Sequence, residues 1–406
     1  MQCVNAKKDQ KRPKNRVFHP DAIVYKRILL ETVKHLPLTA MSSKNTQQEK
    51  KFEPPTVEAF DCKQIDLFQS FLCNHEEQRG KLSNAFPLWD CLPRYSMSRR
   101  AAQKMLKAGT FPKLLNIACQ YLGRKIKIEI QPARLNDNGV ITEYYPGTSE
   151  ELVEDALRKI ATLQNHGYYD ESRPRHGVSF TIYQLRKELK KQGHTRSYQE
   201  VVLSLRILAR SSIEISSEDK KNKIYDVCTY FSRLSTVSRA GLEEDPDAKW
   251  YVEFHPLITK AISAIDYRQF NYELMMSHKT QLARWLHKYL VAKFINASVG
   301  QKFEMRFSTI KRDSGLLEGY GRNRAGMEAV RNALNELANN GILQPILEKE
   351  GKDEKVTPFM ENKIIGSKSE VEDIVYTVFP SAQFSSESKR ANANVNRLKE
   401  KSSADR

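Results

Sequence analysis

The chain has 406 residues, and its 66 Lys and Arg against 49 Asp and Glu give a formal net charge of +17. A surplus of this size favours a polyanionic partner, because each Lys or Arg that meets a phosphate releases condensed counterions. No apolar run approaches the ~18 residues of a membrane-spanning helix, and Met1 to Arg16 lack the apolar segment of a signal peptide. The six cysteines form no Cys-x-x-Cys pair. We therefore expect reduced thiols, no metal site, no membrane partner and a cytoplasmic protein.

The two ends of the chain differ in composition from the middle. Residues 1–60 are basic and polar, with a polar stretch at Met41–Lys51, and are predicted to form a disordered arm. Met41 is an alternative start to Met1. Residues 381–406 are rich in Ser, Asn and Lys and are predicted to form a flexible tail.

Residues 61–145 are predicted to form a small N-terminal region. A basic segment lies at Arg94–Lys107, and the alternating run Lys125–Ile130 predicts a half-buried strand. Asn136–Gly139 is typical of a hairpin turn.

Residues 146–265 show the pattern of a first winged helix. The expected elements, in chain order, are a helix after the N-cap Ser149, a strand at Val178–Ile182, a helix at Tyr183–Lys191, a helix capped by Ser197, strands at Ile213–Ile215 and Ile224–Leu234, and a further strand at Trp250–Phe254.

Residues 266–380 repeat this order and predict a second winged helix. The expected elements are a helix at Lys279–Ala297, a strand at Phe303–Phe307, a short helix from Ser308, a long helix at Arg324–Asn339 stopped by Gly341, and strands at Ile342–Leu347 and Ile374–Phe379.

The repeat decides the fold class. Phe180–Ile182 corresponds to Phe307–Thr309, and Leu205–Ile213 corresponds to Leu334–Ile342. We therefore predict an α+β protein with tandem winged-helix domains, that is, helix-turn-helix units with a β wing, and partly disordered termini.

In a helix-turn-helix, the first turn of the second helix meets the base edges in the major groove. That turn begins near Arg196 in the first half and near Arg322 in the second, and a Lys-rich hairpin tip at Asp219–Lys223 suits contact with the DNA backbone. The alternative is that these residues are solvated caps and turns. The candidate DNA-binding residues are Arg196, Ser197, Tyr198, Gln199, Lys220, Lys221, Lys223, Lys279, Arg322, Asn323, Arg324 and Arg331.

A second motif lies beside the predicted arm. Its residues are Gln64, Ile65, Asp66, Leu67 and Phe68. A Gln, an aliphatic residue and a Leu-Phe pair have the form of the bacterial sliding-clamp-binding peptide, in which apolar anchors fill a pocket. The alternative is one turn of an ordinary amphipathic helix.

The common catalytic motifs are absent from the sequence. It contains no P-loop, no Gly-x-Ser-x-Gly elbow and no His-Glu-x-x-His. The nine histidines form no His-x-His pair of the kind that a rolling-circle nickase uses to hold its metal. We therefore expect a protein that is not an enzyme and needs no cofactor.

The winged-helix residues resemble those of TrfA-type plasmid replication initiators, the Rep family. The resemblance lies in Glu151–Val153, Val178–Leu185, Leu203–Leu205, Ser277–Arg284 and the Arg324–Leu343 helix, with Gln64–Phe68 upstream, where that family also carries a clamp-binding peptide. It covers about 60% of the chain at low identity, and the N-terminal arm departs from it.

The resemblance implies a plasmid replication initiator that binds directly repeated double-stranded origin sites, called iterons. It further implies origin opening, control of plasmid copy number, and recruitment of the host sliding clamp and replicative helicase. Single-stranded DNA is a further candidate partner, and we expect a monomer–dimer equilibrium. Two other classes stay open at this stage. A winged-helix transcriptional repressor or partition protein would share the fold without melting DNA, and a nuclease or relaxase would need metal ligands.

Overall fold

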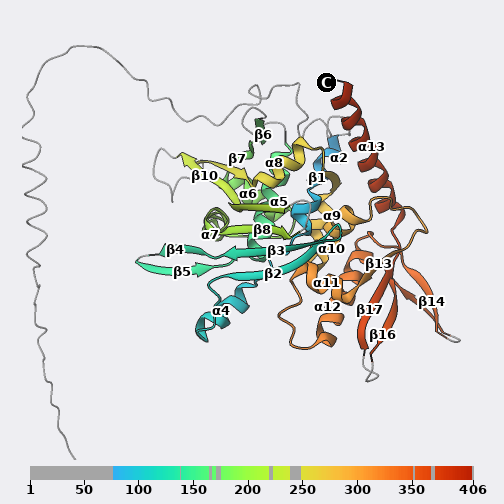
Figure 1. Ribbon diagram of the computed structural model, residues 1–406. Coiled ribbons are helices and arrows are strands. Elements are labelled where there is room, and N and C mark those ends of the chain that lie inside the picture. Colours follow the sequence, from blue (N-terminus) through green and yellow to red (C-terminus); the bar gives the residue numbers. More distant parts are fainter. Residues whose placement is uncertain are drawn as a thin grey trace, which may run out of the picture. The chain divides into compact units, whose positions relative to one another are not determined.

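The structure is a computed structural model that describes residues 76–404, apart from short segments at 138, 164–166, 171–174, 219–222, 238–247, 351–352 and 367–370 (Figure 1). The predicted arm, the Gln64–Phe68 motif and two of the candidate lysines, Lys220 and Lys221, lie outside the described residues. None of the helices that the structure describes is long and apolar enough to cross a membrane.

The first half has winged-helix topology, as predicted. Its helices are α5 (Thr148–Ala161), α6 (Ile182–Lys191) and α7 (Tyr198–Arg210), and its strands are β6 (Gly167–Asp170), β7 (Arg175–Thr181), β10 (Phe231–Val237) and β11 (Lys249–Phe254). The strands pair antiparallel in the order β10-β11-β7-β6. The hairpin β10–β11 is therefore the wing, and α6 and α7 form the helix-turn-helix.

The second half repeats this topology. Its helices are α10 (Gln281–Lys293), α11 (Phe307–Ser314) and α12 (Asn323–Asn339), and its strands are β13 (Phe303–Arg306), β16 (Phe359–Ile365) and β17 (Val371–Val378). The strand order is β13-β17-β16, so the last strand again lies between the other two. The predicted tandem winged-helix fold of the α+β class is confirmed.

The predicted correspondence between the halves holds at one place and fails at another. Helices α7 and α12 end at Arg210 and Asn339, at the same distance after Leu205 and Leu334, which are both fully buried. At the other place, Thr181 is the N-cap of α6, whereas Arg306 is the N-cap of α11. Ile182 therefore matches Phe307, and the pairing of Phe180 with Phe307 was out of register.

The predicted wings were wrong, because each half carries an additional hairpin between its long helix and its wing. These hairpins are β8 (Ser212–Glu218) with β9 (Lys223–Thr229), and β14 (Ile346–Glu350) with β15 (Asp353–Thr357). The Asp219–Lys223 turn therefore joins β8 to β9, outside the winged-helix sheet. The run Ile224–Leu234 concealed the break at Tyr230, where the chain leaves one sheet for another and the Tyr230 ring is buried.

Residues 82–145 are integrated with both winged helices and do not stand apart as a separate region. Strand β1 (Leu82–Ala85) pairs with β12 (Arg268–Asn271). Strands β2 (Leu115–Tyr121) and β3 (Arg124–Gln131) pair with the inserted hairpin in the order β2-β3-β8-β9. The predicted strand at Lys125–Ile130 is confirmed as β3, with Ile126, Ile128 and Ile130 buried.

The other elements that the structure describes are a further hairpin and several short helices. The Asn136–Gly139 turn connects β4 (Ala133–Asp137) to β5 (Val140–Tyr144), and the Gly139 N–H donates to Asn136 Oδ1 at 2.8 Å. The helices are α2 (Glu76–Lys81), α3 (Pro87–Cys91), α4 (Arg99–Lys107), α8 (Pro256–Ser263) and α9 (Tyr272–Ser277).

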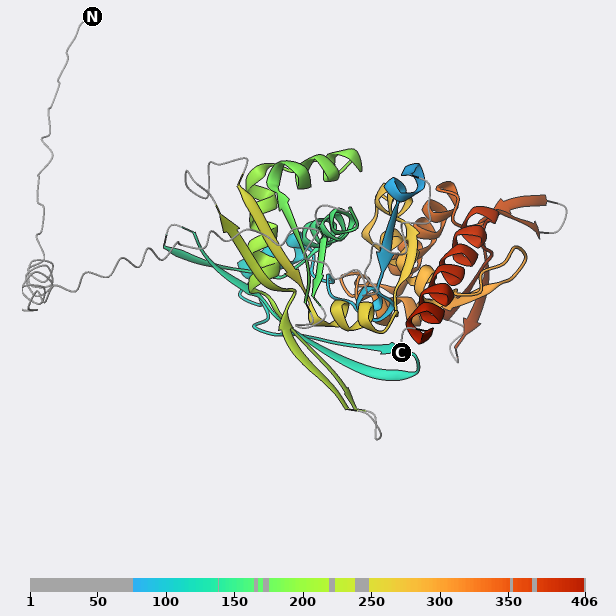
Figure 2. The same ribbon diagram turned by 90° about the horizontal axis from the view of Figure 1, so that it is seen from above.

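The predicted flexible tail is a helix, α13 (Ala382–Ala404), which Figure 2 shows in red beside the second half. Ser381 caps it by accepting from the Phe384 N–H at 3.0 Å. Phe384, Ala391 and Leu398 recur at heptad spacing and are buried. The small and polar residues between them disguised this apolar stripe in the sequence.

Candidate nucleic-acid interface

The first turn of α7 is closed by a reciprocal capping box. The Ser197 hydroxyl accepts from the Glu200 N–H at 3.2 Å, and the Glu200 carboxylate accepts from the Ser197 N–H at 2.8 Å. The hydrogen bond from the Ser197 backbone lowers the pKa of Glu200, so this carboxylate is charged at neutral pH. Ser197 therefore stabilises the helix, and its hydroxyl is already engaged.

The neighbouring candidates in this half differ in how accessible they are. Gln199 is exposed, and Arg196 is half-buried and donates to the Thr195 carbonyl at 2.9 Å. Tyr198 is half-buried and packs against the core. Lys223 begins β9, away from the wing. Arg196 and Gln199 are thus the candidates in this turn that are placed to reach a base.

The first turn of α12 has the opposite character. Arg322, Asn323 and Arg324 are all exposed, and neither arginine side chain has a partner among the described residues. Lys311 from α11 reaches Asn323 Oδ1 at 3.4 Å. The N-cap makes no side-chain hydrogen bond and the first turn holds no acidic residue, so the positive end of the helix dipole is uncompensated. This turn suits an anionic partner.

The turn between α11 and α12 depends on a glycine. Gly315 ends α11 in the left-handed conformation, with φ of 63°. A Cβ atom there would lie 2.9 Å from Pro93 Cβ and 3.0 Å from Ser96 Cβ. Both the backbone conformation and the close approach of the Pro93 segment therefore require Gly315.

The remaining two candidates of the second half are placed differently from those in the first turn of α12. Arg331 donates through Nε and Nη2 to the Glu361 carboxylate at 2.5 and 3.1 Å, and also binds Glu328. Arg331 therefore ties wing strand β16 to α12, and it is not presented to a ligand as we predicted. Lys279 is exposed just before α10, and its backbone N–H donates to Glu336.

Two further basic surfaces were not among the candidate DNA-binding residues, although the sequence analysis noted one of them as a basic segment. Helix α6 exposes Arg186, Lys187 and Lys190 together with the Tyr183 ring, which is 63% exposed. Helix α4 exposes a second row of cations within the Arg94–Lys107 segment. In both helices, the spacing of three and four residues was the available signal.

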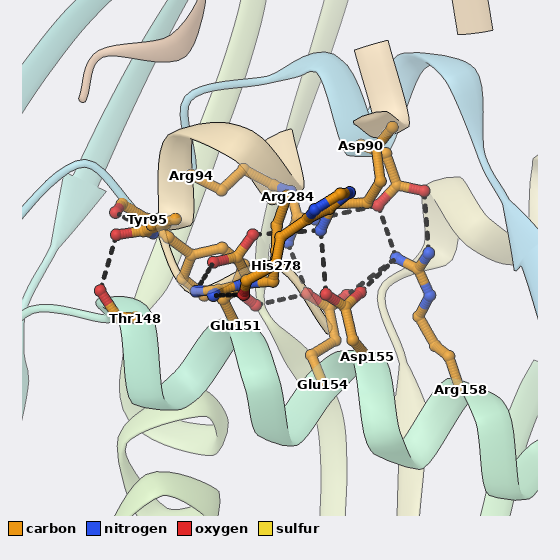
Figure 3. Close-up of polar contacts among 12 residues, drawn as sticks. Asp90, Arg94, Tyr95, Thr148, Glu151, Glu154, Asp155, Arg158, His278 and Arg284 are labelled. Carbon is orange, nitrogen blue, oxygen red and sulfur yellow. Dashed lines mark hydrogen bonds and ion pairs between the residues drawn. The ribbon is translucent and has the colours of Figure 1, made fainter. Parts of the chain in front are cut away.

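A buried network of charges joins the first helix of each winged helix (Figure 3). Every residue from Glu150 to Ala161 of α5 is buried, on the polar as well as the apolar face. We call this network the charged seam, and its members are Asp90, Arg94, Glu151, Glu154, Asp155, Arg158, Arg284 and Lys288.

The direct link between the halves runs from α10 to α5. Lys288 Nζ lies 3.1 Å from Glu151 Oε1 and 2.9 Å from Asp155 Oδ2. Arg284 Nη2 lies 3.3 Å from Glu151 Oε2. The link is short, and because all four groups are buried, dissolved salt screens it only weakly.

The rest of the charged seam fixes the α3 segment to α5. Arg158 donates to both oxygens of Asp90 at 2.6 and 2.8 Å. Arg94 donates to Glu154 Oε2 at 2.7 Å, and Trp89 Nε1 donates to Glu154 Oε1 at 2.6 Å. Glu154 is therefore fully satisfied, as a buried carboxylate must be.

The pKa values show which carboxylates keep their charge. Burial opposes the charged forms of Glu151 and Glu154, but their cationic partners outweigh burial and lower both pKa values. Burial raises the pKa of Asp155 more than Lys288 lowers it. Burial lowers the pKa of Lys288, but Asp155 and Glu151 outweigh burial and raise it, so Lys288 keeps its charge between the two halves.

The exposed side chains of the two helix-turn-helix units form a surface suited to binding. No cluster of three or more His, Cys, Asp or Glu side chains that could hold a metal is found among the described residues. The exposed groups at the two helix-turn-helix units include Arg, Lys, Gln and Asn, the side chains that read base edges and phosphates, together with the Glu200 carboxylate.

Comparison with known proteins gives matches to solved structures alone. No protein-family model matches the chain, and neither does a curated protein. A crystal structure of domains 2 and 3 of RctB is similar at 11% identity, covering 66% of this chain and 91% of that chain with a TM-score of 0.41. A second RctB structure of the same domains has a TM-score of 0.39 at 11% identity, covering 69% of this chain and 95% of that chain.

The Pi initiator protein in complex with iteron DNA is also similar, at 10% identity. That match covers 58% of this chain and 91% of that chain, with a TM-score of 0.36. An initiator bound to iteron DNA is thus among the solved structures that the chain resembles.

Proposed function

We propose that this chain is a non-enzymatic, sequence-specific DNA-binding protein of the cytoplasm that initiates replication of a plasmid-type replicon. One observation carries the proposal. Two helix-turn-helix units of identical topology, each with exposed basic or amide side chains in the first turn of its second helix, are held together by the charged seam. A rigid pair of such units suits one double-stranded site that spans two segments of major groove.

The sequence resemblance to TrfA-type initiators extends this proposal. The double-stranded sites are then directly repeated iterons, and bound protein opens the origin and recruits the host helicase and sliding clamp. A monomer–dimer equilibrium would couple occupancy of the repeats to plasmid copy number.

Binding to origin DNA is the first test. Fragments flanking the gene, with and without tandem direct repeats of ~20 base pairs, are compared by gel shift at several salt concentrations. If 6–10 phosphates are neutralised, affinity falls by about three to five orders of magnitude between 50 and 200 mM salt. A flat salt profile, or equal affinity for random DNA, would contradict the proposal.

Origin opening separates this function from the alternative, a winged-helix transcriptional repressor or partition protein. Permanganate reactivity of thymines beside the repeats is measured with and without the protein on supercoiled DNA. An initiator makes them reactive, whereas a repressor binds the same sites and leaves them paired. A nicking assay with added divalent metal tests the enzymatic alternative, and nicked product would overturn the assignment as a non-enzyme.

Recruitment of the clamp is tested at Gln64–Phe68. Replacing Leu67 and Phe68 by Ala removes two apolar anchors worth roughly 3 to 6 kcal/mol before ordering costs. We expect loss of clamp pull-down with double-stranded DNA binding intact. If the double variant instead loses DNA binding or unfolds, these side chains belong to a core and the motif is not a clamp ligand.

A further inference from the structure

Helix α4 carries a row of cations that bind nothing else in the described part of the chain. Arg100, Lys104 and Lys107 are all exposed, and none makes an ion pair or a side-chain hydrogen bond with the residues that the structure describes. They lie three and four residues apart, so they follow one side of the helix. No residue of α4 is buried, which leaves the helix standing against the body rather than within it.

The position of α4 is fixed by its first residues. Ser98 caps the helix by accepting from the Ala101 N–H at 3.1 Å. Arg99 Nη2 donates to Glu150 of α5 at 2.7 Å and to Ser204 of α7 at 3.5 Å. The start of α4 is therefore attached to the first winged helix, beside its second helix-turn-helix helix.

The same helix borders the second helix-turn-helix across a groove. The groove has a volume of about 1500 Å³ and is lined by Arg100 and Lys104 on the α4 side and by Lys311, Tyr320 and Asn323 on the other. Asn323 is the first residue of α12. Helix α4 is thus bonded to α7 through Arg99 and lines the groove opposite Asn323, the first residue of α12.

Charge is not uniform in this groove. The wall opposite α4 also includes Glu318, Glu328 and Glu372. Glu328 is paired with Arg331, whereas Glu318 and Glu372 are exposed. The carboxylates of Glu318 and Glu372 repel phosphate from their part of that wall, so an anionic strand would follow the rim formed by α4 and pass to the first turn of α12.

We propose that α4 is a third DNA-contacting element, in which Arg100 and Lys104 bind phosphates of the double-stranded backbone that runs between the two recognition helices. This inference rests on the proposed function, since it assumes that α7 and α12 lie on one duplex. Cations on the flank of a helix, rather than in the first turn of a recognition helix, position the protein on DNA without reading its sequence.

The test measures salt dependence of binding for the full chain. In the Arg100→Ala/Lys104→Ala variant, the slope of log affinity against log salt should become shallower by about 1.8, since each lost phosphate contact contributes about 0.9. Affinity should fall by the same factor for cognate and random duplexes. The control Lys389→Ala/Lys399→Ala removes two exposed cations from α13 and should keep the wild-type slope.

A charge-keeping variant, Arg100→Lys/Lys104→Arg, guards against misfolding and should retain the wild-type slope. The proposal is overturned if the Ala variant keeps the wild-type slope, or loses affinity for the cognate duplex alone. It is also overturned if only single-stranded DNA or a protein partner is lost. Should the wild-type chain bind no duplex at all, the proposed function itself has failed, which is a separate result from an unchanged slope in the variant.

Discussion

The two recognition helices occupy the same place in the two halves, but the side chains of their first turns carry opposite charge. Helix α7 starts with a closed capping box that places the Glu200 carboxylate at its positive end. Helix α12 starts with Arg322, Asn323 and Arg324 and no side-chain cap. A carboxylate in the first turn repels phosphate, whereas an open, basic first turn attracts it. On the proposed function, we therefore expect α12 to contribute more of the affinity for DNA, and α7 to make base contacts through Arg196 and Gln199.

Both recognition helices must be held by one scaffold if they are to lie on one duplex. We therefore expect the largest loss of stability when the charged seam is broken. Lys288→Met leaves Glu151 and Asp155 buried beside each other without their shared cation, and should cost about 3 to 5 kcal/mol in the free energy of unfolding. Urea denaturation measures it. The control Lys302→Met removes an exposed pair with Glu304 and should change stability by about 0 to 1 kcal/mol. Equal effects would show that the charged seam does not join the halves.

Each half also buries two histidines, and these predict a loss of stability in mild acid. Burial lowers the pKa of His176 to about 3 in the first half and that of His255 to about 4. It lowers the pKa of His278 to about 4 in the second half and that of His287 well below its ordinary value.

A histidine that stays neutral in the fold takes up its proton only on unfolding. The free energy of unfolding is therefore at its maximum above the unfolded pKa of ~6.5, where the histidine is neutral in both states. It falls as the pH drops from there toward the folded pKa, because only the unfolded chain binds the proton. Each histidine should cost about 1 kcal/mol between pH 6.5 and 5.5, and all four about 4 kcal/mol. Urea denaturation at successive pH values measures this, and His287→Leu should reduce the pH slope by one proton. A slope that stays near zero down to pH 5 would contradict it.

The difference between the recognition helices is tested next by Arg324→Ala and Arg196→Ala. Each should cost about 1 to 3 kcal/mol on the cognate site and relax the preference at a particular base pair if it grips a base. We expect the larger loss for Arg324, because Arg196 is half-buried and bonded to Thr195. Competition binding against single-base variants of the site measures it. Equal losses on cognate and random DNA would make both arginines phosphate contacts.

The smallest effect tests the carboxylate that distinguishes α7. Glu200→Gln keeps the side chain's ability to accept from the Ser197 N–H but removes the negative charge at the helix start. Affinity for any duplex should rise by about 0.3 to 1 kcal/mol at low salt, and this gain should disappear at high salt. The comparable Glu328→Gln change in α12 frees Arg331 in part and lies past the first turn, so it serves as the matched control. No gain for Glu200→Gln would mean that α7 does not approach phosphate.

The repeat and the start of α7 were predictable because they depend on local signals, whereas the N-cap expected at Ser149 was wrong, since α5 begins at Thr148 after Gly147. Ser197 with Glu200 is a capping box that can be read in the sequence, and the matching ends of α7 and α12 follow from leucines at equal spacing. The wings were not predictable, because a strand's partner is a tertiary choice: the residues on either side of Tyr230 have equal strand character but enter different sheets.

The charged seam and α13 were missed for a related reason. The charges of α5 recur at positions 151, 154, 155 and 158, which is typical of a solvated helix face. Only the docking of α10 and of the α3 segment buries them. Likewise, the stripe of α13 includes Ser388 and Ala391, whose burial depends on the surface beneath them. The candidate DNA residues in the first turns were located correctly on their helices, whereas the tie between Arg331 and Glu361 depends on a wing strand that the sequence placed elsewhere.

The hairpins β8–β9 and β14–β15 occupy the same point of the two halves, between the long helix and the wing. Two independent insertions at one point are less economical than a single insertion into an ancestral unit that was later duplicated. The two hairpins differ in the strands that pair with them. The first hairpin joined β2 and β3 in one sheet, while the second remained a two-stranded ribbon whose paired Leu347 and Val356 are 65% and 64% exposed. A single insertion before duplication would place both hairpins at the same point, and only the first of them belongs to a larger sheet.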